Sequence, residues 1–388
     1  MSETIPFNRP GLVGTEFERL AAAVSGGHTS SSGPFTDRAV HLIGEALGAR
    51  DVALTTSCTD ALEMTALLLD LGPGDTVIVP SFTFTSTALA YARQGVNVRF
   101  ADIEPVTLGI DPHHVEALLD DSVRAVVVVH YAGVPCDLDG IAEVLADRPD
   151  VALIEDNAHG LFATHRGRPL GTFGRFATLS FHETKNFTCG EGGALVVNDE
   201  RDVARAHTIL DKGTDRREFL LGHVDKYSWR DTGSSFGLSD LLAAYLVAQL
   251  EGADEILARR GAVTERYREM LAGPAGELGV TLPSVPDTAT SAHHMFHVLL
   301  PSGEVRDQVL ADMRAEGVNA VFHYVPLHSS PAGRRFSDRD HACPVTDDVS
   351  ARLLRLPYFN DLTASDQERV VDVFVAATRR AVGTTARP

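Results

Sequence analysis

The chain has 388 residues, 44% of them hydrophobic, which is enough for two domains with hydrophobic cores. Acidic residues outnumber basic ones by 53 to 34, so the formal net charge is −19. This charge argues against a nucleic-acid or anionic-membrane binder, because both partners are polyanions. No stretch approaches the roughly 20 apolar residues of a membrane span. The first residues lack a secretory signal, and the four cysteines are widely spaced. We therefore expect a cytoplasmic protein without a disulfide framework or zinc cluster.

Between Asp51 and Asn198 the hydrophobic pattern alternates between helices and strands. Helical spacing of apolar residues predicts helices over Thr59–Leu71, Phe84–Gln94 and Asp137–Arg148. Short apolar runs predict strands over Thr76–Pro80, Val96–Ile103, Ala125–His130, Val151–Asp156, Phe176–Phe181 and Ala194–Asn198. Apolar strands separated by helices are typical of a mostly parallel sheet covered on both faces, so the predicted fold class is α/β.

The rest of the chain has a different pattern. A helical stretch from Ser239 to Leu271 is followed by the Gly- and Pro-rich segment Gly273–Pro286, which indicates a boundary. Beyond it the pattern predicts strands over Phe296–Leu300 and Asn319–Tyr324, and helices over Val305–Glu316 and Ala364–Thr378. We predict a large α/β domain over residues 1–255, including the N-terminal segment, and a small C-terminal α+β domain over residues 256–388.

Three polar side chains lie at or just beyond the ends of predicted strands. Asp156 and Ser180 end two of them, and Lys185 follows five residues after Ser180. In open α/β sheets, ligands bind at the carboxyl ends of the strands. A lysine amine and a carboxylate are what pyridoxal phosphate needs, for its Schiff base and for its protonated ring nitrogen. The chain has only three lysines, and from spacing alone a surface lysine at position 185 is equally open.

Two further segments could complete such a cofactor site. In Thr55–Met64 a loop enters a helix at Ser57, Cys58 and Thr59, and helix N-termini bind phosphate. A plain N-cap is the alternative for these hydroxyls. Phe82 and Phe84 could stack on a pyridine ring or simply pack in the core.

Seven segments in a fixed order resemble one known family. They are SCTDALEM, VPSFTFTSTA, VVHYAG, EDNAHG, SFHETKNFTCGEGGA, GSSFGLSDLLAAYLVAQLE and FHYVPLH. Together they resemble the DegT/DnrJ/EryC/StrS sugar-nucleotide aminotransferases over nearly the whole chain. Within that family they are most similar to the transaminases that form dTDP-4-amino-4,6-dideoxygalactose. The resemblance implies the aspartate-aminotransferase fold (fold type I), pyridoxal 5′-phosphate as cofactor and a homodimer with shared active sites.

The resemblance also implies roles for single residues. Lys185 would be the catalytic residue, bonded covalently to the cofactor and then moving the proton between donor and cofactor. Asp156 would pair with the ring nitrogen and His159 would contact the 3′-oxygen. The phosphate would be held by Ser180, Cys58 and Thr59, and Phe84 would stack on the ring. Ser235 would approach the phosphate from the partner subunit, at a position where the family usually has Asn.

On the substrate side the resemblance implies that His323, Tyr324 and His328 line the sugar pocket. A metal site formed by His323 and His328, and purely structural histidines, are the alternatives. The tandem pairs His113–His114 and His293–His294 are interpreted as solvated or structural.

The implied reaction moves an amino group from L-glutamate to C4 of TDP-4-keto-6-deoxy-D-glucose. The product would be a TDP-4-amino-4,6-dideoxyhexose, with the galacto form favoured and the gluco form possible. Amination at C3 of a TDP-3-keto-6-deoxy sugar is one alternative. The other is a non-catalytic regulator that binds the cofactor or the sugar nucleotide, which the presence of both Lys185 and Asp156 disfavours.

Overall fold

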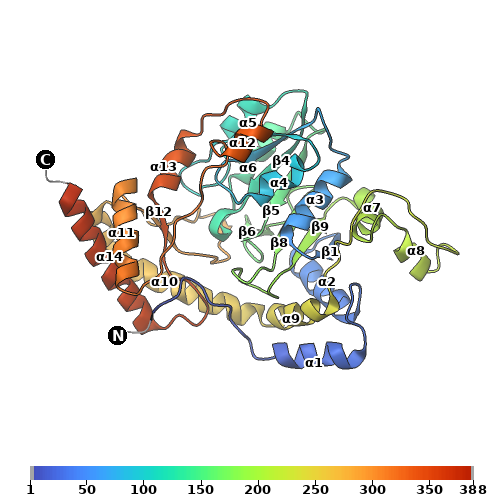
Figure 1. The fold of residues 1–388 in the computed structure, drawn as a ribbon, viewed down its shortest axis with the longest axis horizontal. Coiled ribbons are helices and arrows are strands. Elements are labelled where there is room, and N and C mark those ends of the chain that lie inside the picture. Colours follow the sequence, from blue (N-terminus) through green and yellow to red (C-terminus); the bar gives the residue numbers. More distant parts are fainter. Residues whose placement is uncertain (1–3, 386–388) are drawn as a thin grey trace.

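A seven-stranded sheet forms the centre of the protein in the computed structural model, which describes residues 4–385 (Figure 1). Its strands lie in the order β1-β9-β8-β5-β4-β2-β3. Their bounds are β1 Asp51–Thr55, β2 Thr76–Pro80, β3 Asn97–Ala101, β4 Val123–Val129, β5 Ala152–Asp156, β8 Phe176–Ser180 and β9 Gly193–Val197. The five strands from β8 to β3 run parallel. The predicted α/β class with a mostly parallel sheet is confirmed.

Helices cover both faces of the sheet because successive strand residues point to opposite sides. In β2, Val77 and Val79 pack in one hydrophobic cluster and Ile78 packs in another. The first face carries α3 Cys58–Leu68, α4 Ser86–Ala92 and α7 Glu200–Leu210. The second carries α2 Pro34–Leu47, α5 Pro112–Leu118, α6 Leu138–Leu145 and α9 Asp240–Glu251. Burial on both faces explains why most residues of these strands are apolar.

One edge of the sheet departs from parallel pairing. Strand β9 runs antiparallel to both β8 and β1, and β1 was not predicted as a strand. The loop between β8 and β9 carries Lys185. Because β8 runs parallel to β5, this loop lies at the same end of the sheet as the carboxyl end of β5.

The C-terminal part packs around a second hydrophobic cluster. It contains α10 Ala253–Leu278, β11 His297–Leu299, α11 Gly303–Ala315, α13 Pro344–Arg352, β12 Leu353–Arg355 and α14 Ala364–Thr385. Figure 1 shows α11 and α14 side by side at one end of the molecule, with α10 running from there toward α9. Helix α10 reaches from the large-sheet region, where Ile256 packs, to this cluster, where Val263 packs. Ile5 also packs in the C-terminal cluster. The predicted division after residue 255 stays a prediction.

The remaining elements are short or peripheral. They are α1 Glu16–Gly26, η1 Tyr131–Gly133, β6 Thr164–His165, β7 Arg168–Pro169, α8 Arg216–Leu220, β10 Ala289–Thr290 and α12 Pro331–Phe336. Within the part of the chain that the structure describes, no helix is long and apolar enough to cross a membrane.

Two predicted features of the C-terminal part are wrong. The boundary segment Gly273–Pro286 begins inside α10, which continues to Leu278 with Pro274 in its interior. Burial of Leu271, Ala275 and Leu278 in the C-terminal cluster offsets the helix-breaking tendency of that proline. The segment Asn319–Tyr324 is not a strand, because only Val321 pairs with Arg355 in an isolated bridge. The last two residues of this segment, His323 and Tyr324, line a cavity.

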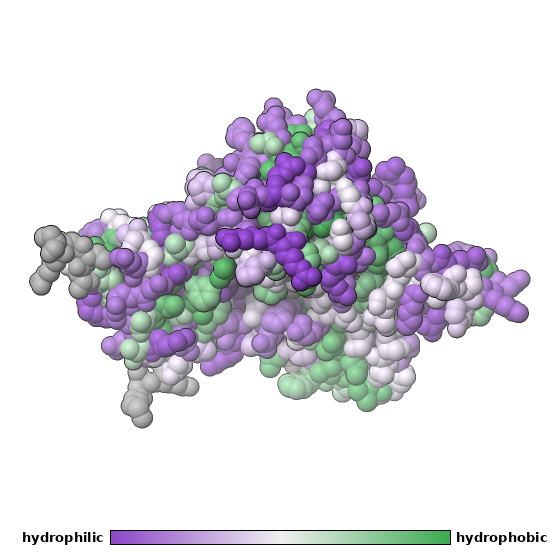
Figure 2. All heavy atoms as spheres, turned by 45° about the horizontal axis from the view of Figure 1, so that its top comes forward, coloured by the Kyte–Doolittle hydropathy of each residue, from purple (hydrophilic) through white to green (hydrophobic). Residues whose placement is uncertain are grey.

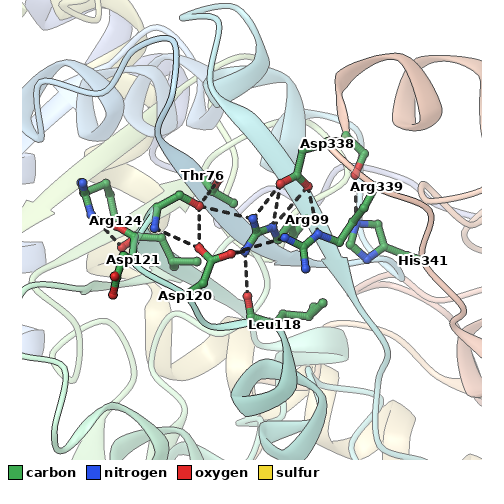
Figure 3. A network of polar contacts seen from close by, with 12 residues as sticks. Thr76, Arg99, Leu118, Asp120, Asp121, Arg124, Asp338, Arg339 and His341 are labelled. Carbon is green, nitrogen blue, oxygen red and sulfur yellow. Dashed lines mark hydrogen bonds and ion pairs between the residues drawn. The ribbon is translucent and has the colours of Figure 1, made fainter.

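A buried arginine joins strand β3 to the segment that follows α12. The Arg99 side chain is only 3% exposed, and its guanidinium lies 2.7 Å from Asp120 and 2.7 Å from Asp338. It also donates to the Leu118 carbonyl at 2.9 Å, so its charge is surrounded by acceptors (Figure 3). These contacts fix part of the C-terminal chain against the central sheet.

Replacing this arginine tests the junction. We expect Arg99→Met to lower the free energy of unfolding by about 2–3 kcal/mol, because it leaves two carboxylates without their buried cation. The cost stays moderate because Asp120 and Asp338 are partly exposed and can be hydrated. Urea unfolding measures it. Arg124→Met is the matched control, since this exposed side chain pairs with Asp75 at 3.2 Å and its loss should cost less than about 1 kcal/mol. Equal costs would contradict the interpretation.

Candidate active site

A cavity of about 540 Å³ opens at the carboxyl ends of the parallel strands. The ends of β4, β5 and β8 contribute to its wall, as expected for a ligand site in an open α/β sheet. Nine of the residues predicted from the sequence line it, namely Cys58, Thr59, Phe84, Asp156, His159, Ser180, Lys185, His323 and Tyr324. Residues separated by more than 260 positions in the chain thus meet in one site.

Asp156 is a buried carboxylate at the end of β5. It is 6% exposed, and it accepts hydrogen bonds from the Thr87 hydroxyl at 2.7 Å and the Ala158 amide at 3.3 Å. Burial raises the pKa of this carboxyl, while Thr87 and the nearby Lys185 act in the opposite direction. A cationic nitrogen placed beside Asp156 would favour its ionised form.

Lys185 lies on the turn between β8 and β9, where its backbone amide bonds to the His182 carbonyl at 2.9 Å. Burial lowers the pKa of its amine to about 8, although Cys58 and Asp156 act to raise it. Burial also raises the pKa of the Cys58 thiol to about 12, so the thiol stays protonated. At pH 7 about a tenth of Lys185 is therefore a free amine, far more than for an ordinary lysine.

The N-terminus of α3 forms another part of the wall. Ser57 caps the helix by accepting from the Asp60 amide at 3.0 Å, and the Thr59 hydroxyl donates to Ser86 at 2.7 Å. The Asp60 carboxylate is bonded to the Thr56 hydroxyl and is not among the lining residues. Ser57 is thus an N-cap, and the helix terminus also faces a cavity.

The helix terminus packs directly on strand β9. A Cβ at Gly193 would lie 2.4 Å from the Cys58 backbone nitrogen and 2.4 Å from the Ser57 carbonyl carbon. Only a glycine therefore allows this close approach of strand and helix.

Gly193→Ala should displace the start of α3. We expect a loss of about 2 kcal/mol of stability and a phosphate affinity at least about tenfold weaker, because backbone atoms cannot move aside as a flexible side chain can. The measurements are thermal unfolding and titration of the apoprotein with pyridoxal phosphate. Gly44→Ala, in α2 with no atom near its added Cβ, is the control and should leave the affinity unchanged. An unchanged affinity in Gly193→Ala would contradict the role of this contact.

The wall opposite β9 is aromatic. The Phe84 ring is 59% exposed and lies 6.4 Å from the ring of Tyr324. His323 Nδ1 is 3.0 Å from the Tyr131 hydroxyl, and burial lowers the pKa of this histidine far below its usual value. His323 is therefore a neutral hydrogen-bonding group, and Phe84 presents an open ring face.

His159 lies beside Lys185 in the same wall. Its ring stacks on His294, with centroids 4.1 Å apart and an interplanar angle of 16°. Its Nδ1 is buried without a hydrogen-bond partner. Burial, together with the positive charge of Lys185, holds the pKa of His159 well below the usual range.

Two predicted site residues lie elsewhere. His328 does not line this cavity: its Nδ1 is 2.7 Å from the Ser81 hydroxyl and its Nε2 is 3.6 Å from Asp347. The expectation that it lines the sugar pocket is therefore corrected, because these contacts turn its ring away. Ser235 is exposed and lies outside the cavity of its own subunit, so its predicted approach from a partner stays a prediction.

Several lining residues were missed from the sequence. Arg355 on β12 was not considered, and His294 was interpreted as solvated or structural. For His294, the tandem pair His293–His294 was a visible signal in the sequence. For Arg355 there was no local signal, because this residue reaches the site through the pairing of β11 with β12.

The residues present fit a pyridine cofactor that carries a phosphate. Asp156 suits a ring nitrogen, the unpartnered His159 suits a ring oxygen, and the open Phe84 face suits the ring itself. The α3 terminus supplies the amides for a phosphate. Every one of these groups lines the cavity that contains the Lys185 amine.

Comparisons with known proteins agree with this chemistry. The model of the DegT/DnrJ/EryC1/StrS aminotransferase family matches residues 12–375. The aminotransferase TlmJ from Streptoalloteichus hindustanus is 29% identical, with a TM-score of 0.89 over 97% of this chain and 99% of that one. DesV from S. venezuelae, solved with a ketimine intermediate, is 28% identical, with a TM-score of 0.87 over 98% and 100%. The sugar aminotransferase CalS13 from Micromonospora echinospora is 25% identical, with a TM-score of 0.86 over 96% and 99%.

Proposed function

Since this chain belongs to the DegT/DnrJ/EryC1/StrS family of pyridoxal-phosphate-dependent sugar aminotransferases, we propose that it aminates C4 of TDP-4-keto-6-deoxy-D-glucose. The amino donor is L-glutamate and the product is TDP-4-amino-4,6-dideoxygalactose. The observation that carries the proposal is that Lys185, Asp156 and the N-terminus of α3 line one cavity. The sequence likeness to C4 transaminases supports the choice of sugar.

The cofactor is placed by four groups of residues in this proposal. Asp156 pairs with the ring nitrogen and His159 contacts the ring oxygen. The α3 terminus with Cys58 and Thr59, together with Ser180, holds the phosphate. When bound, the cofactor supplies an electron sink that stabilises negative charge at the reacting carbon.

The chain's own residues then handle protons and position. Lys185 binds the cofactor through its amine and, once released, moves a proton at the reacting carbon. Its pKa of about 8 suits both tasks, because amine and ammonium forms are both populated near neutral pH. Thr87 holds Asp156 in place through its 2.7 Å hydrogen bond, and His323 and Tyr324 contact the sugar.

Arg355 is a second cationic group in the cavity lining, beside Lys185. Its Nε is buried without a hydrogen-bond partner, its Nη2 donates to the Phe322 carbonyl at 3.3 Å, and its guanidinium lies over the Phe7 ring at 4.7 Å from the centroid. Among the described residues no carboxylate lies within ion-pair distance of it. Burial lowers its pKa, so an anion beside it would be stabilising. In this proposal that anion is a carboxylate of the donor.

The lowered pKa of Lys185 predicts a pH dependence. Only the neutral amine of Lys185 could bond to the aldehyde of pyridoxal phosphate, with release of water, so capture by the apoprotein should accelerate as pH rises through about 8 and then level off. An ordinary lysine would keep gaining rate beyond pH 10. Stopped-flow absorbance of apoprotein mixed with the cofactor, from pH 6 to 10.5, measures this. A rate still rising steeply above pH 9.5 would contradict a depressed pKa.

The proposal includes a cytoplasmic homodimer in which Ser235 reaches the partner's phosphate site. Two features support a second copy as partner. Exposed apolar side chains lie on α1, where Phe17 is 72% exposed, and on the segment between α7 and α9, where Trp229 is 81% exposed. Figure 2 shows hydrophobic side chains gathered along the lower edge of the molecule, the side on which α1 lies in Figure 1.

A two-stage assay on purified holoenzyme tests the function. L-glutamate should bleach the visible cofactor band, and TDP-4-keto-6-deoxy-D-glucose should then restore it. NMR of the product distinguishes the galacto from the gluco epimer through the H3–H4 coupling. If a TDP-3-keto sugar restores the band instead, the enzyme aminates C3 and the proposed C4 reaction is wrong. If glutamate does not bleach the band, L-glutamate is not the amino donor.

A further inference from the structure

Two residues that the sequence analysis did not assign to the site, His294 and Asn186, fix the position of the His159 ring. The outer face of the His159 ring is covered by His294, in a parallel stack with centroids 4.1 Å apart. Tyr131 approaches the same ring edge-on, at 6.1 Å and 67°. A ring packed in this way cannot turn without displacing its neighbours.

His294 is itself fixed by Asn186, the residue next to Lys185. The Asn186 amide group donates from Nδ2 to the Ala292 carbonyl at 2.6 Å. Its Oδ1 therefore faces His294 Nδ1 at 2.9 Å and accepts a hydrogen bond from it. This bond assigns the proton of neutral His294 to Nδ1.

The backbone around His294 is also anchored. Arg260, a buried residue of α10, donates to the His293 carbonyl at 2.9 Å and to the His294 carbonyl at 2.6 Å. His293 has a φ of +52°, a left-handed conformation that a residue with a Cβ rarely adopts. Such strain persists only where surrounding contacts hold it, and here it turns the next side chain toward His159.

Two cations, Lys185 and Arg355, act on both rings of the stacked pair, and Arg260 also acts on His294. His130 and His323 lie nearby, and the Asp156 carboxyl group lines the same cavity. Burial and these cations keep the pKa of both stacked rings well below the ordinary value. Two imidazolium rings 4.1 Å apart would repel each other, so His159 reaches the cavity as a neutral group.

We propose that His294 and Asn186 are positioning residues that hold His159 in a fixed plane and keep it neutral where it meets the cofactor's ring oxygen. This inference rests on the proposed function, because it takes pyridoxal phosphate as the ligand of His159. It also links two parts of the site, since Asn186 and Lys185 share one turn. The turn that presents the amine thereby also orients the histidine.

Two variants of His294 test the proposal. His294→Ala removes the stack and the bond to Asn186 and admits water to His159, so the pKa of the His159 imidazole should rise toward its ordinary value. We expect the pKa of the visible cofactor band to fall by about one unit and the dissociation constant of pyridoxal phosphate to rise about tenfold. His294→Phe keeps a ring face but loses the bond to Asn186, and should show a smaller shift of the same sign.

The measurements are a pH titration of the visible band, equilibrium titration of apoprotein with the cofactor, and thermal unfolding of the apoprotein. His41→Ala, which removes an exposed histidine paired with Glu45, is the control and should match the parent in all three. If His294→Ala does not fold, the His294→Phe result decides. Folded variants with the parent's band pKa and cofactor affinity would overturn the proposal. A parent protein without any visible band would instead overturn the proposed function.

Discussion

Lys185→Ala is expected to lower the transamination rate by at least about 10⁴-fold, because it removes both the covalent attachment and the proton carrier. Among the residues that the structure describes, no other lysine lines the cavity, and Lys212 is exposed and pairs with Asp211 at 2.8 Å. Single-turnover absorbance after mixing with L-glutamate measures the effect. Borohydride reduction followed by peptide mass analysis should label position 185 in the parent and nothing in the variant.

Two companion variants separate chemistry from binding. Lys212→Ala should keep the parent's rate, since its side chain lies outside the cavity. Lys185→Arg keeps a positive charge near Asp156 but cannot form the covalent bond. It should be as inactive as Lys185→Ala, and it should bind the cofactor more tightly than Lys185→Ala does. A rate above one tenth of the parent's in either Lys185 variant would refute the assigned role.

Asp156→Asn is expected to slow the donor half-reaction by about 10³-fold. Asparagine has the same shape and can still accept from Thr87, so the cavity should be preserved. What is lost is the negative charge that keeps the cofactor's ring nitrogen protonated. Stopped-flow bleaching by L-glutamate measures the rate, and thermal unfolding checks the fold.

A modified cofactor provides the matched control for this variant. Pyridoxal phosphate methylated on its ring nitrogen carries a permanent positive charge and does not need Asp156 for protonation. Reconstitution with it should narrow the gap between variant and parent to about tenfold. Thr87→Val, which removes the hydrogen bond to Asp156 and the 2.9 Å hydrogen bond to the Thr83 hydroxyl, should cost about tenfold with the ordinary cofactor. An unimpaired Asp156→Asn protein would exclude the proposed pairing.

The central sheet could be predicted because its strands are buried on both faces. The run Ala125–Val129 is apolar at every position, and this pattern depends only on the strand and the helices beside it. The antiparallel edge could not be predicted in the same way. Strands β1 and β9 lie far apart in the chain, and pairing direction leaves no mark in the local pattern.

The helix α10 illustrates a limit of local propensity. Gly273 and Pro274 indicate a break, and that inference considers only the neighbouring residues. In the folded chain, Leu271 and Leu278 on either side of the proline are buried in the C-terminal cluster. Tertiary packing thus overrides a preference of a few kcal/mol.

The sequence by itself determined the parts of the site that lie at strand ends. Asp156, Ser180 and Lys185 are placed by the two strands that precede them, so their meeting follows from parallel pairing. Only the tertiary structure showed that His294 and Arg355 line the cavity and that His328 does not. His294 enters the site while His328 turns to Ser81, although both stood in motifs rich in histidine. The reason is physical: the direction of a loop side chain depends on long-range contacts, here those of Arg260, Asn186 and Ser81. No spacing within the chain encodes such contacts.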